Sequence, residues 1–252
     1  MGKRRLFGID VDDVGLAEAA DTVVRWAAEE GARRYVVTPN VDHIVRLERD
    51  AEFRAVYAGA ALTLPDGMPL VWASRLLGRP LPARVTGADL FPEVCARAAA
   101  AGLPIFLLGG LPGVADRAAD ALRARHPALR VAGTYSPPFG FENDAAENER
   151  VVAAVNAAAA PILFVGLGAP KQEKWVAREL PRLAARVALG VGAAFDFVAG
   201  SKRRAPALVR RAGFEFLWRF AQEPRRLFRR YFVDDVRFAA MVWRERRRGG
   251  TR

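Results

Sequence analysis

Short runs of consecutive apolar residues alternate with longer amphipathic stretches over the first 200 residues of the chain. The apolar runs predict β-strands, and the stretches between them, with their helical spacing of apolar residues, predict α-helices. The predicted strands are Leu6–Ile9, Tyr35–Thr38, Leu62–Leu64, Ile105–Leu108, Arg130–Gly133, Ile162–Val165 and Val187–Val191. The predicted helices are Leu16–Glu30, Ala88–Ala101, Gly113–Arg125, Ala145–Ala158 and Lys171–Leu180.

This strand–helix–strand alternation is typical of a parallel sheet, because parallel neighbours need a crossover connection and the crossover is usually a helix. Ile105–Leu108 and Ile162–Val165 are apolar at every position, as expected of strands that are covered on both faces. The pattern therefore predicts an α/β fold for residues 1–201, with a Rossmann-like parallel sheet and helices on both faces.

The last part of the chain, residues 202–252, has a different pattern. Its apolar residues recur at helical spacing, and it is rich in arginine and aromatic residues. Pro206 and Pro224 are expected in the first turns of two helices. An apolar stripe on the second helix would consist of Leu227, Tyr231, Phe238 and Met241. We predict that residues 202–252 form a helical appendage to the α/β domain.

The formal net charge of +11 is concentrated in this appendage. Residues 1–201 hold 23 Lys/Arg and 23 Asp/Glu, whereas residues 202–252 hold 16 Lys/Arg and 5 Asp/Glu, a difference of +11. A basic segment of this kind favours a polyanionic partner. The candidate partners are nucleic acid, an acidic membrane surface and a substrate diphosphate. One cysteine and two histidines argue against a disulfide framework and against a zinc site.

Residues 151–170 carry no charge and approach the length of a membrane span. Because Pro161, Gly166 and Pro170 interrupt them, a helix end followed by a buried strand explains them better. We expect neither a transmembrane helix nor a signal peptide.

Ligands of open parallel sheets bind at the carboxyl ends of the strands, and small or polar residues follow five of the predicted strands. Three of these turns are rich in glycine, which lets backbone amides approach a phosphate. The glycines selected as nucleotide or diphosphate contacts are Gly109, Gly110, Gly113, Gly166, Gly168 and Gly192. Close packing of helices against strands explains each single turn equally well, and no Walker lysine pattern is present.

Asp66 is the strongest catalytic candidate, because a carboxylate at a strand end can accept a proton from a ligand hydroxyl. An ordinary Asp-Gly turn is the alternative explanation. Thr38 and Asn40 could bind sugar hydroxyls, although Asn40 could equally cap the helical run that follows it.

Three further polar residues are candidates for substrate contact. Arg84 could neutralise phosphate charge or could be a solvated surface residue. Gln172 and Glu173 could contact the sugar or ribose, or could simply occupy a first helical turn, where acidic residues are favoured.

Two aspartate pairs resemble metal-binding Asp-x-Asp sequences, but neither leads us to predict a metal site. Asp10 and Asp12 precede a predicted helix, which they are expected to cap, and Asp234 and Asp235 lie among arginines. The arginines of the appendage could supply the positive charge that a metal ion otherwise brings to a leaving diphosphate.

Taken together and in this order, the motifs of the chain resemble those of the bacterial WecG/TagA/CpsF glycosyltransferase family over nearly the full length. The motifs are Thr38-Pro-Asn-Val-Asp, Pro65-Asp-Gly-Met-Pro, Arg84-Val-Thr-Gly, Phe106-Leu-Leu-Gly-Gly-Leu-Pro-Gly-Val-Ala, Val165-Gly-Leu-Gly-Ala-Pro-Lys-Gln-Glu-Lys-Trp, Gly190-Val-Gly-Ala-Ala-Phe-Asp and Arg204-Ala-Pro, followed by the Arg- and aromatic-rich appendage.

The resemblance implies an inverting, metal-independent enzyme that needs no cofactor. Its donor would be a UDP-sugar, and its acceptor a sugar on undecaprenyl diphosphate. Asp66 would be the general base, and Thr38, Asn40, Arg84 and Gln172 would line the sugar pocket. The wider set of substrate contacts would include Lys171, Glu173, Asp196, Arg219, Arg226 and Arg229, the last three closing over the diphosphate. The resemblance also implies a homo-oligomer bound peripherally to the cytoplasmic face of the plasma membrane.

Two other classes of protein compete with this interpretation. A nicotinamide- or nucleotide-binding Rossmann enzyme would explain the glycine turns, but the chain lacks the usual glycine fingerprint. A nucleic-acid-binding protein would explain the basic appendage, but its aromatic residues fall at helical spacing, which favours packing against the core over base stacking. We therefore expect no nucleic-acid partner.

Overall fold

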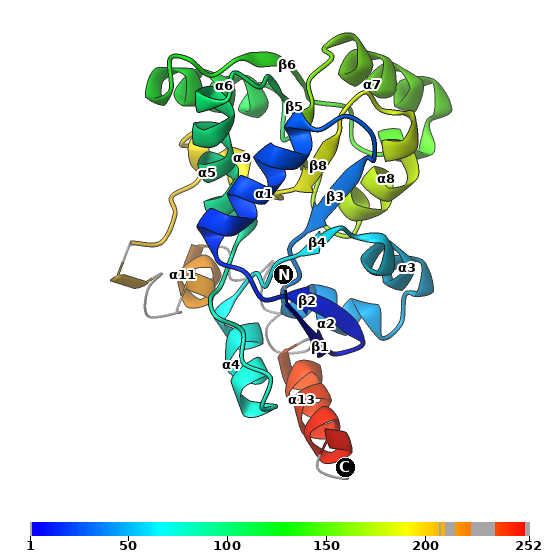
Figure 1. The fold of residues 1–252 in the computed structure, drawn as a ribbon, viewed down its shortest axis with the longest axis vertical. Coiled ribbons are helices and arrows are strands. Elements are labelled where there is room, and N and C mark those ends of the chain that lie inside the picture. The colour runs from blue at the N-terminus through cyan, green and yellow to red at the C-terminus, as the bar shows by residue number, and fades with distance from the viewer. Residues whose placement is uncertain (1, 207, 210–214, 223–234, 250–252) are drawn as a thin grey trace.

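The computed structural model describes residues 2–206, 208–209, 215–222 and 235–249 (Figure 1). Its centre is a six-stranded sheet with the order β4-β3-β8-β7-β5-β6, and every neighbouring pair is parallel. The strands are β3 (Arg34–Val37), β4 (Leu62–Thr63), β5 (Ile105–Gly109), β6 (Val131–Tyr135), β7 (Ile162–Gly166) and β8 (Val187–Gly190). The predicted Rossmann-like parallel α/β fold is confirmed.

Helices cover both faces of the sheet (Figure 1). The first face packs against α1 (Leu16–Ala28), α5 (Gly87–Ala100), α6 (Val114–Arg125) and α9 (Ala194–Val198). The second packs against α7 (Ala145–Ala157) and α8 (Lys171–Glu179). Short 3-10 helices, η1 (Phe141–Asn143) and η2 (Leu180–Arg182), precede α7 and follow α8.

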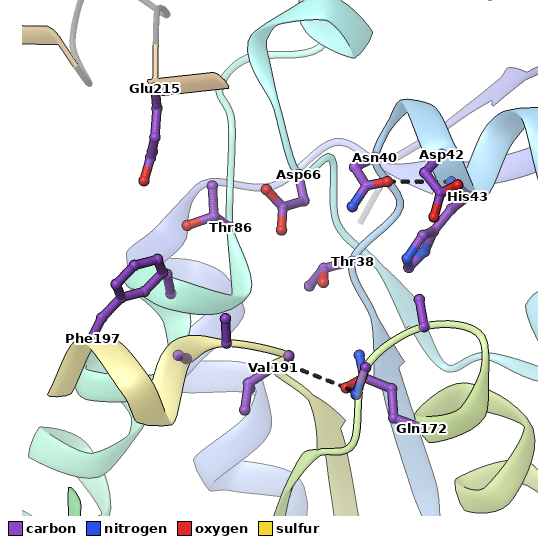
Figure 2. A pocket seen from close by; sticks show the side chains of 16 residues that line it. Thr38, Asn40, Asp42, His43, Asp66, Thr86, Gln172, Val191, Phe197 and Glu215 are labelled. Atoms are coloured by element: carbon purple, nitrogen blue, oxygen red, sulfur yellow. Dashed lines mark hydrogen bonds between the residues drawn. The ribbon is translucent and has the colours of Figure 1, made fainter. Parts of the chain in front are cut away.

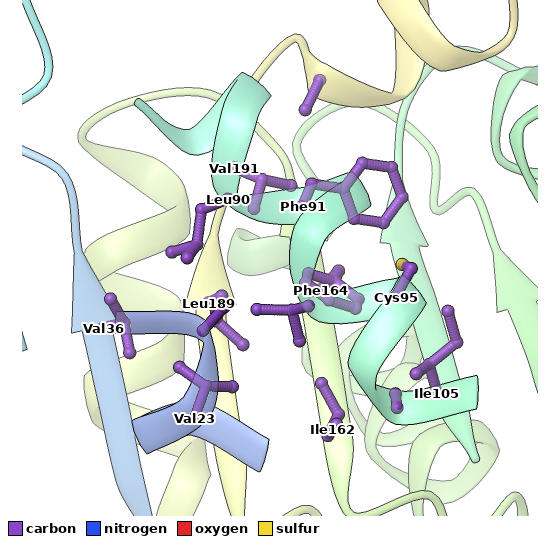
Figure 3. Close-up of a cluster of buried hydrophobic side chains, with 14 of the residues drawn as sticks. Val23, Val36, Leu90, Phe91, Cys95, Ile105, Ile162, Phe164, Leu189 and Val191 are labelled. Atoms are coloured by element: carbon purple, nitrogen blue, oxygen red, sulfur yellow. The ribbon is translucent and has the colours of Figure 1, made fainter. Parts of the chain in front are cut away.

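Strand β7 shows why the central strands are apolar at every position. Ile162 and Phe164 belong to the core beneath α5, whereas Leu163 and Val165 belong to the core beneath α8. Alternate side chains of a strand point to opposite faces, so a strand covered on both sides must be apolar throughout. Phe164 contacts Phe91 of α5 edge-on, with ring centroids 4.7 Å apart (Figure 3).

The strand order reverses between β5 and β7. From β5 the chain passes through α6 on one face to β6, whereas from β7 it passes through α8 on the other face to β8. The two strand ends lie so close that a β-carbon on Gly109 would be 2.6 Å from the carbonyl oxygen of Gly166. Gly109 also has φ +111°, so close backbone packing explains this glycine.

The expected strand over Leu6–Ile9 is wrong. These residues form the turn of an antiparallel hairpin between β1 (Lys3–Leu6) and β2 (Ile9–Asp12), which is separate from the main sheet. Phe7 and Gly8 have φ values of 52° and 82°, which a strand cannot contain. Leu6, Ile9 and Val11 are the buried apolar residues of this hairpin.

The expectation that Asp10 and Asp12 cap α1 is wrong. The residue before α1 is Gly15, and no side chain caps this helix. Asp12 instead accepts a hydrogen bond from the backbone amide of Thr63 at 2.8 Å, which joins the hairpin to β4. Burial raises the pKa of Asp12 despite this bond and the nearby Lys3.

The hairpin, four helices and the end of β3 share a third hydrophobic core. The helices are α2 (Val41–Leu47), α3 (Ala51–Gly59), α4 (Met68–Leu76) and α13 (Asp235–Gly249). Phe238 and Met241 of α13 are buried there, as expected for the apolar stripe, whereas Leu227 and Tyr231 lie outside the described residues. The end of the appendage is thus part of this core. Among the described helices, none is long and apolar enough to cross a bilayer.

Candidate functional site

A cavity of about 380 Å³ lies beyond the carboxyl ends of β3, β4, β7 and β8 (Figure 2). Residues that follow these strands make up most of its wall, and the beginning of α5 and α11 (Glu215–Gln222) supply the rest. The lining residues used below are Thr38, Asn40, Asp42, His43, Asp66, Thr86, Gly168, Gln172, Gly192 and Glu215. The position agrees with the sequence prediction of a site at this edge of the sheet.

Asp66 points into the cavity (Figure 2). Its backbone amide donates to the carbonyl oxygen of Pro39 at 2.8 Å, so the segments that follow β3 and β4 are held together. Gly67, with φ +129°, then turns the chain into α4. The Asp-Gly turn therefore exists, and it also directs the carboxylate into the cavity.

Thr38 and Asn40 line the cavity on the β3 side. Thr38 is buried, whereas Asn40 is partly exposed. The side-chain oxygen of Asn40 accepts a hydrogen bond from the backbone amide of His43 at 3.2 Å and so caps α2. The capping role considered for Asn40 is thus present, at the wall of the cavity.

Gln172 is 3% exposed, and its amide connects two strand ends. Its Oε1 atom accepts hydrogen bonds from the backbone amides of Gly168 and Gly192, each at 3.2 Å. Its Nε2 atom donates to the carboxylate of Glu173 at 2.7 Å. Gln172 therefore holds the segments that follow β7 and β8 against each other, and Glu173 fixes its amide orientation from behind the cavity wall.

The predicted glycines fall into two groups. Gly168 and Gly192 line the cavity, and a β-carbon on either would meet no atom within 4 Å. Gly109, Gly110, Gly113 and Gly166 lie outside the cavity lining, and a β-carbon on any of them would be 3.3 Å or closer to a neighbouring atom. Helix and strand packing accounts for the second group.

Several other predicted residues lie away from the cavity wall. Lys171 forms an ion pair with Glu142 at 2.9 Å, and Asp196 sits in the first turn of α9. Arg84 forms ion pairs just behind the wall. Arg219 is in α11 but its side chain is not among those described, and Arg226 and Arg229 lie outside the described residues.

Sequence reasoning did not select His43, although it lines the cavity. Nδ1 of His43 is 2.6 Å from the hydroxyl of Tyr57. Burial raises the pKa of Tyr57 well above its ordinary value, and the charges of Glu173, Asp66 and Asp42 add to this effect. The hydroxyl therefore stays protonated beside the site. His43 follows Asn40 by three residues, which is about one helical turn. This spacing could have identified His43 as a neighbour of Asn40 at the site.

Sequence reasoning also missed Thr86 and Glu215. Thr86 caps α5 by accepting from the backbone amide of Asp89 at 3.0 Å. Glu215 comes from the appendage, so no local pattern connects it with the strand ends. Thr86 belongs to the Arg-Val-Thr-Gly motif. The sequence therefore indicated this segment, but not Thr86 itself.

The cavity wall is acidic. Asp42, Asp66 and Glu215 contribute carboxylates, and no lysine or arginine occurs among the described residues that line it. Within the described ranges, no three Asp, Glu, His or Cys side chains gather as a metal site would require. A carboxylate beside polar neutral groups can take a proton from a bound hydroxyl.

The chain is similar to known glycosyl transferases over most of its length. The model of the glycosyl transferase WecG/TagA/CpsF family matches residues 4–252. Two proteins of Staphylococcus aureus, from strains MRSA252 and MW2, are named N-acetylglucosaminyldiphosphoundecaprenol N-acetyl-beta-D-mannosaminyltransferase. The first is 27% identical over 215 residues, which is 85% of this chain and 82% of that protein. The second is 27% identical over 225 residues, which is 89% of this chain and 86% of that protein.

Proposed function

Because the chain belongs to the WecG/TagA/CpsF family of glycosyl transferases, we propose that it moves a sugar from a UDP-sugar to a sugar on a polyprenyl diphosphate. N-acetylmannosamine is the first candidate for the transferred sugar, since the relatives are named for its transfer to an N-acetylglucosamine-diphosphoundecaprenol acceptor. A hexose is the second candidate. The reaction would serve the synthesis of a cell-surface polysaccharide.

This proposal rests on the position of Asp66. Its carboxylate enters a cavity built from four strand ends, where a ligand of a parallel sheet is expected. Asp66 takes the proton of the acceptor hydroxyl while the oxygen of that hydroxyl forms a bond to the anomeric carbon. The bond from that carbon to the diphosphate breaks, and UDP leaves with the electron pair. Attack from the side opposite UDP inverts the anomeric configuration.

Polar residues around Asp66 would orient the two sugars. Thr38 and Asn40 stand on one side of the cavity, and Gln172 holds the glycine segments on the other. The open space beside Gly168 and Gly192 leaves room for a substrate to approach the backbone. We assign the stabilisation of the leaving diphosphate to arginine side chains, Arg219, Arg226 and Arg229 included, in place of a metal ion.

The acceptor lipid implies a membrane surface, and we propose peripheral binding at the cytoplasmic face by a homo-oligomer. On α13, Trp243 is 55% exposed and the Arg247 guanidinium stacks on it at 3.8 Å. Such a surface suits the headgroup region of an anionic bilayer. Replacing Arg244 and Arg247 by glutamine should reduce co-sedimentation with phosphatidylglycerol vesicles, and unchanged co-sedimentation would exclude this surface.

A transfer assay tests the function. The purified protein is incubated with an N-acetylglucosamine-diphosphate lipid and, separately, UDP-N-acetylmannosamine, UDP-N-acetylglucosamine, UDP-glucose and UDP-galactose. We expect mass spectrometry to show one added sugar with one donor, and nuclear magnetic resonance to show an inverted anomeric centre. Retention of configuration, or stabilisation of the protein by NAD with no effect of UDP, would contradict the proposal.

A further inference from the structure

Four charged side chains form a closed ring of alternating sign next to the cavity. Arg84 contacts Glu215 at 2.8 Å, and Glu215 contacts Arg204 at 3.3 Å. Arg204 contacts Asp89 at 2.7 Å, and Asp89 contacts Arg84 at 3.5 Å. The four side chains are between 13% and 21% exposed, so solvent screens the ring only in part.

The two carboxylates of the ring differ in their attachment. Asp89 belongs to the first turn of α5, exchanges hydrogen bonds with Thr86 and is therefore fixed to the α/β domain. Burial alone would raise the pKa of Asp89, but hydrogen bonding and attraction from Arg204 outweigh burial and lower it. Glu215 belongs to α11 of the appendage and is the ring member that lines the cavity (Figure 2).

The charge of the cavity creates a conflict with its proposed donor. A sugar nucleotide brings a diphosphate, yet the described lining contains three carboxylates and neither lysine nor arginine. Arg84 and Arg204 lie directly behind the Glu215 carboxylate, which contacts both guanidinium groups. Removal of that carboxylate would change the ring from neutral to a charge of +1 and would leave both guanidinium groups without their partner on the cavity side.

We propose that Arg84 and Arg204 form the binding site for the donor diphosphate, and that Glu215 occupies this site until the diphosphate displaces it. Guanidinium groups bind carboxylate and phosphate oxygens with the same fork geometry, so one anion can replace the other on the same pair. The exchange moves Glu215, and α11 with it, when the donor arrives. This inference rests on the proposed function, because it assigns a place to the diphosphate of the donor.

Isothermal titration calorimetry with inorganic pyrophosphate, UDP and uridine tests the exchange. Glu215→Gln keeps the shape of the side chain but removes the competing charge. It should tighten pyrophosphate and UDP binding by roughly five-fold or more, as is typical of coupling between two binding events. Uridine, which has no phosphate, should bind both proteins equally. Arg204→Gln should weaken pyrophosphate binding by about ten-fold, because a charged hydrogen bond is lost.

Glu245→Gln is the matched control, since it removes one negative charge from the appendage at a distance from the ring. Glu245 accepts from the backbone amide of Phe7 at 2.8 Å and pairs with Arg79 at 3.1 Å. Pyrophosphate affinity should not change in this variant. Glu215→Ala repeats the test with a second side chain if the glutamine variant folds poorly, as judged by circular dichroism.

Weaker or unchanged pyrophosphate binding by the Glu215 variants overturns the exchange, and weaker binding would show that Glu215 holds α11 in a binding-competent place. Absence of pyrophosphate binding in every variant overturns it as well. If Glu215→Gln tightens pyrophosphate but no variant binds UDP, the anion site stands and the proposed UDP-sugar donor fails.

Discussion

Gln172 donates a hydrogen bond from its side-chain nitrogen to the carboxylate of Glu173, its neighbour in the first turn of α8, at 2.7 Å. A carboxylate accepts hydrogen bonds and cannot donate them when ionised, so this contact fixes the nitrogen of Gln172 toward Glu173. The amide oxygen then faces the backbone amides of Gly168 and Gly192. One buried residue thus determines how two strand ends meet at the cavity.

Gln172→Leu should destabilise the protein by about 1–3 kcal/mol, because two backbone amides lose their acceptor. Urea unfolding measures this loss. Glu173→Gln is the matched control, since its amide oxygen can still accept from Gln172, and it should cost about 1 kcal/mol or less. Equal losses for the two variants would mean that hydrogen bonding to the glycine amides is not what Gln172 contributes.

Two substitutions of Asn40 should distinguish its structural role from its functional role. Asn40→Ala removes the cap of α2 and should cost about 0.5–2 kcal/mol, whereas Asn40→Ser keeps a capping oxygen and most of the stability. If the amide also contacts a sugar, both variants lose transfer activity. Thermal unfolding together with the transfer assay distinguishes the roles, and full activity of the serine variant would restrict Asn40 to capping.

Asp89 should make the stability of the protein depend on pH in the acid range. Its pKa is lower in the folded protein than in the unfolded chain, where it is about 3.9. A lowered pKa stabilises the folded state above pH ~3.9, and the stabilisation is lost as the pH falls through the folded value. The difference in Tm between the wild type and Asp89→Asn should therefore shrink from pH ~6 to pH ~3. A constant difference would contradict this assignment.

Transfer activity should survive removal of divalent cations, because we assign the diphosphate to arginine side chains. The assay is repeated after dialysis against EDTA, and again with added Mg²⁺ or Mn²⁺. We expect rates within about two-fold of each other, well below the change that loss of a catalytic metal causes. A strong loss with EDTA that Mg²⁺ restores would require a metal at the site.

Sequence patterns predicted those features of the protein that depend on residues close together in the chain. Phe164 and its neighbours identified a strand buried on both faces, and Asp66 followed a strand into the cavity. The hairpin was mistaken for one strand because Leu6 and Ile9 flank its turn and both face the core. The glycine at position 8, a residue type that readily adopts the positive φ of a tight turn, was the missed signal.

Contacts between distant segments could not be predicted in this way. Arg84 and Glu215 are 131 residues apart, and no spacing rule relates a loop before α5 to a helix in the appendage. The glycines of the strand ends looked alike in sequence, yet only the folded chain distinguishes Gly192 at the cavity from Gly109 against backbone. The direction of the Gln172 amide likewise depended on a three-dimensional network.

The role of Asp66 as general base is tested by the rate of transfer by Asp66→Asn, measured beside the binding of UDP to the same variant. Asparagine keeps the size of the side chain but cannot act as a general base. Turnover should fall by roughly 10²–10⁴-fold, the usual effect of losing such a group, while the affinity for UDP stays within about two-fold of the wild type. Turnover close to that of the wild type would show that another group takes the proton and would contradict the central role of Asp66.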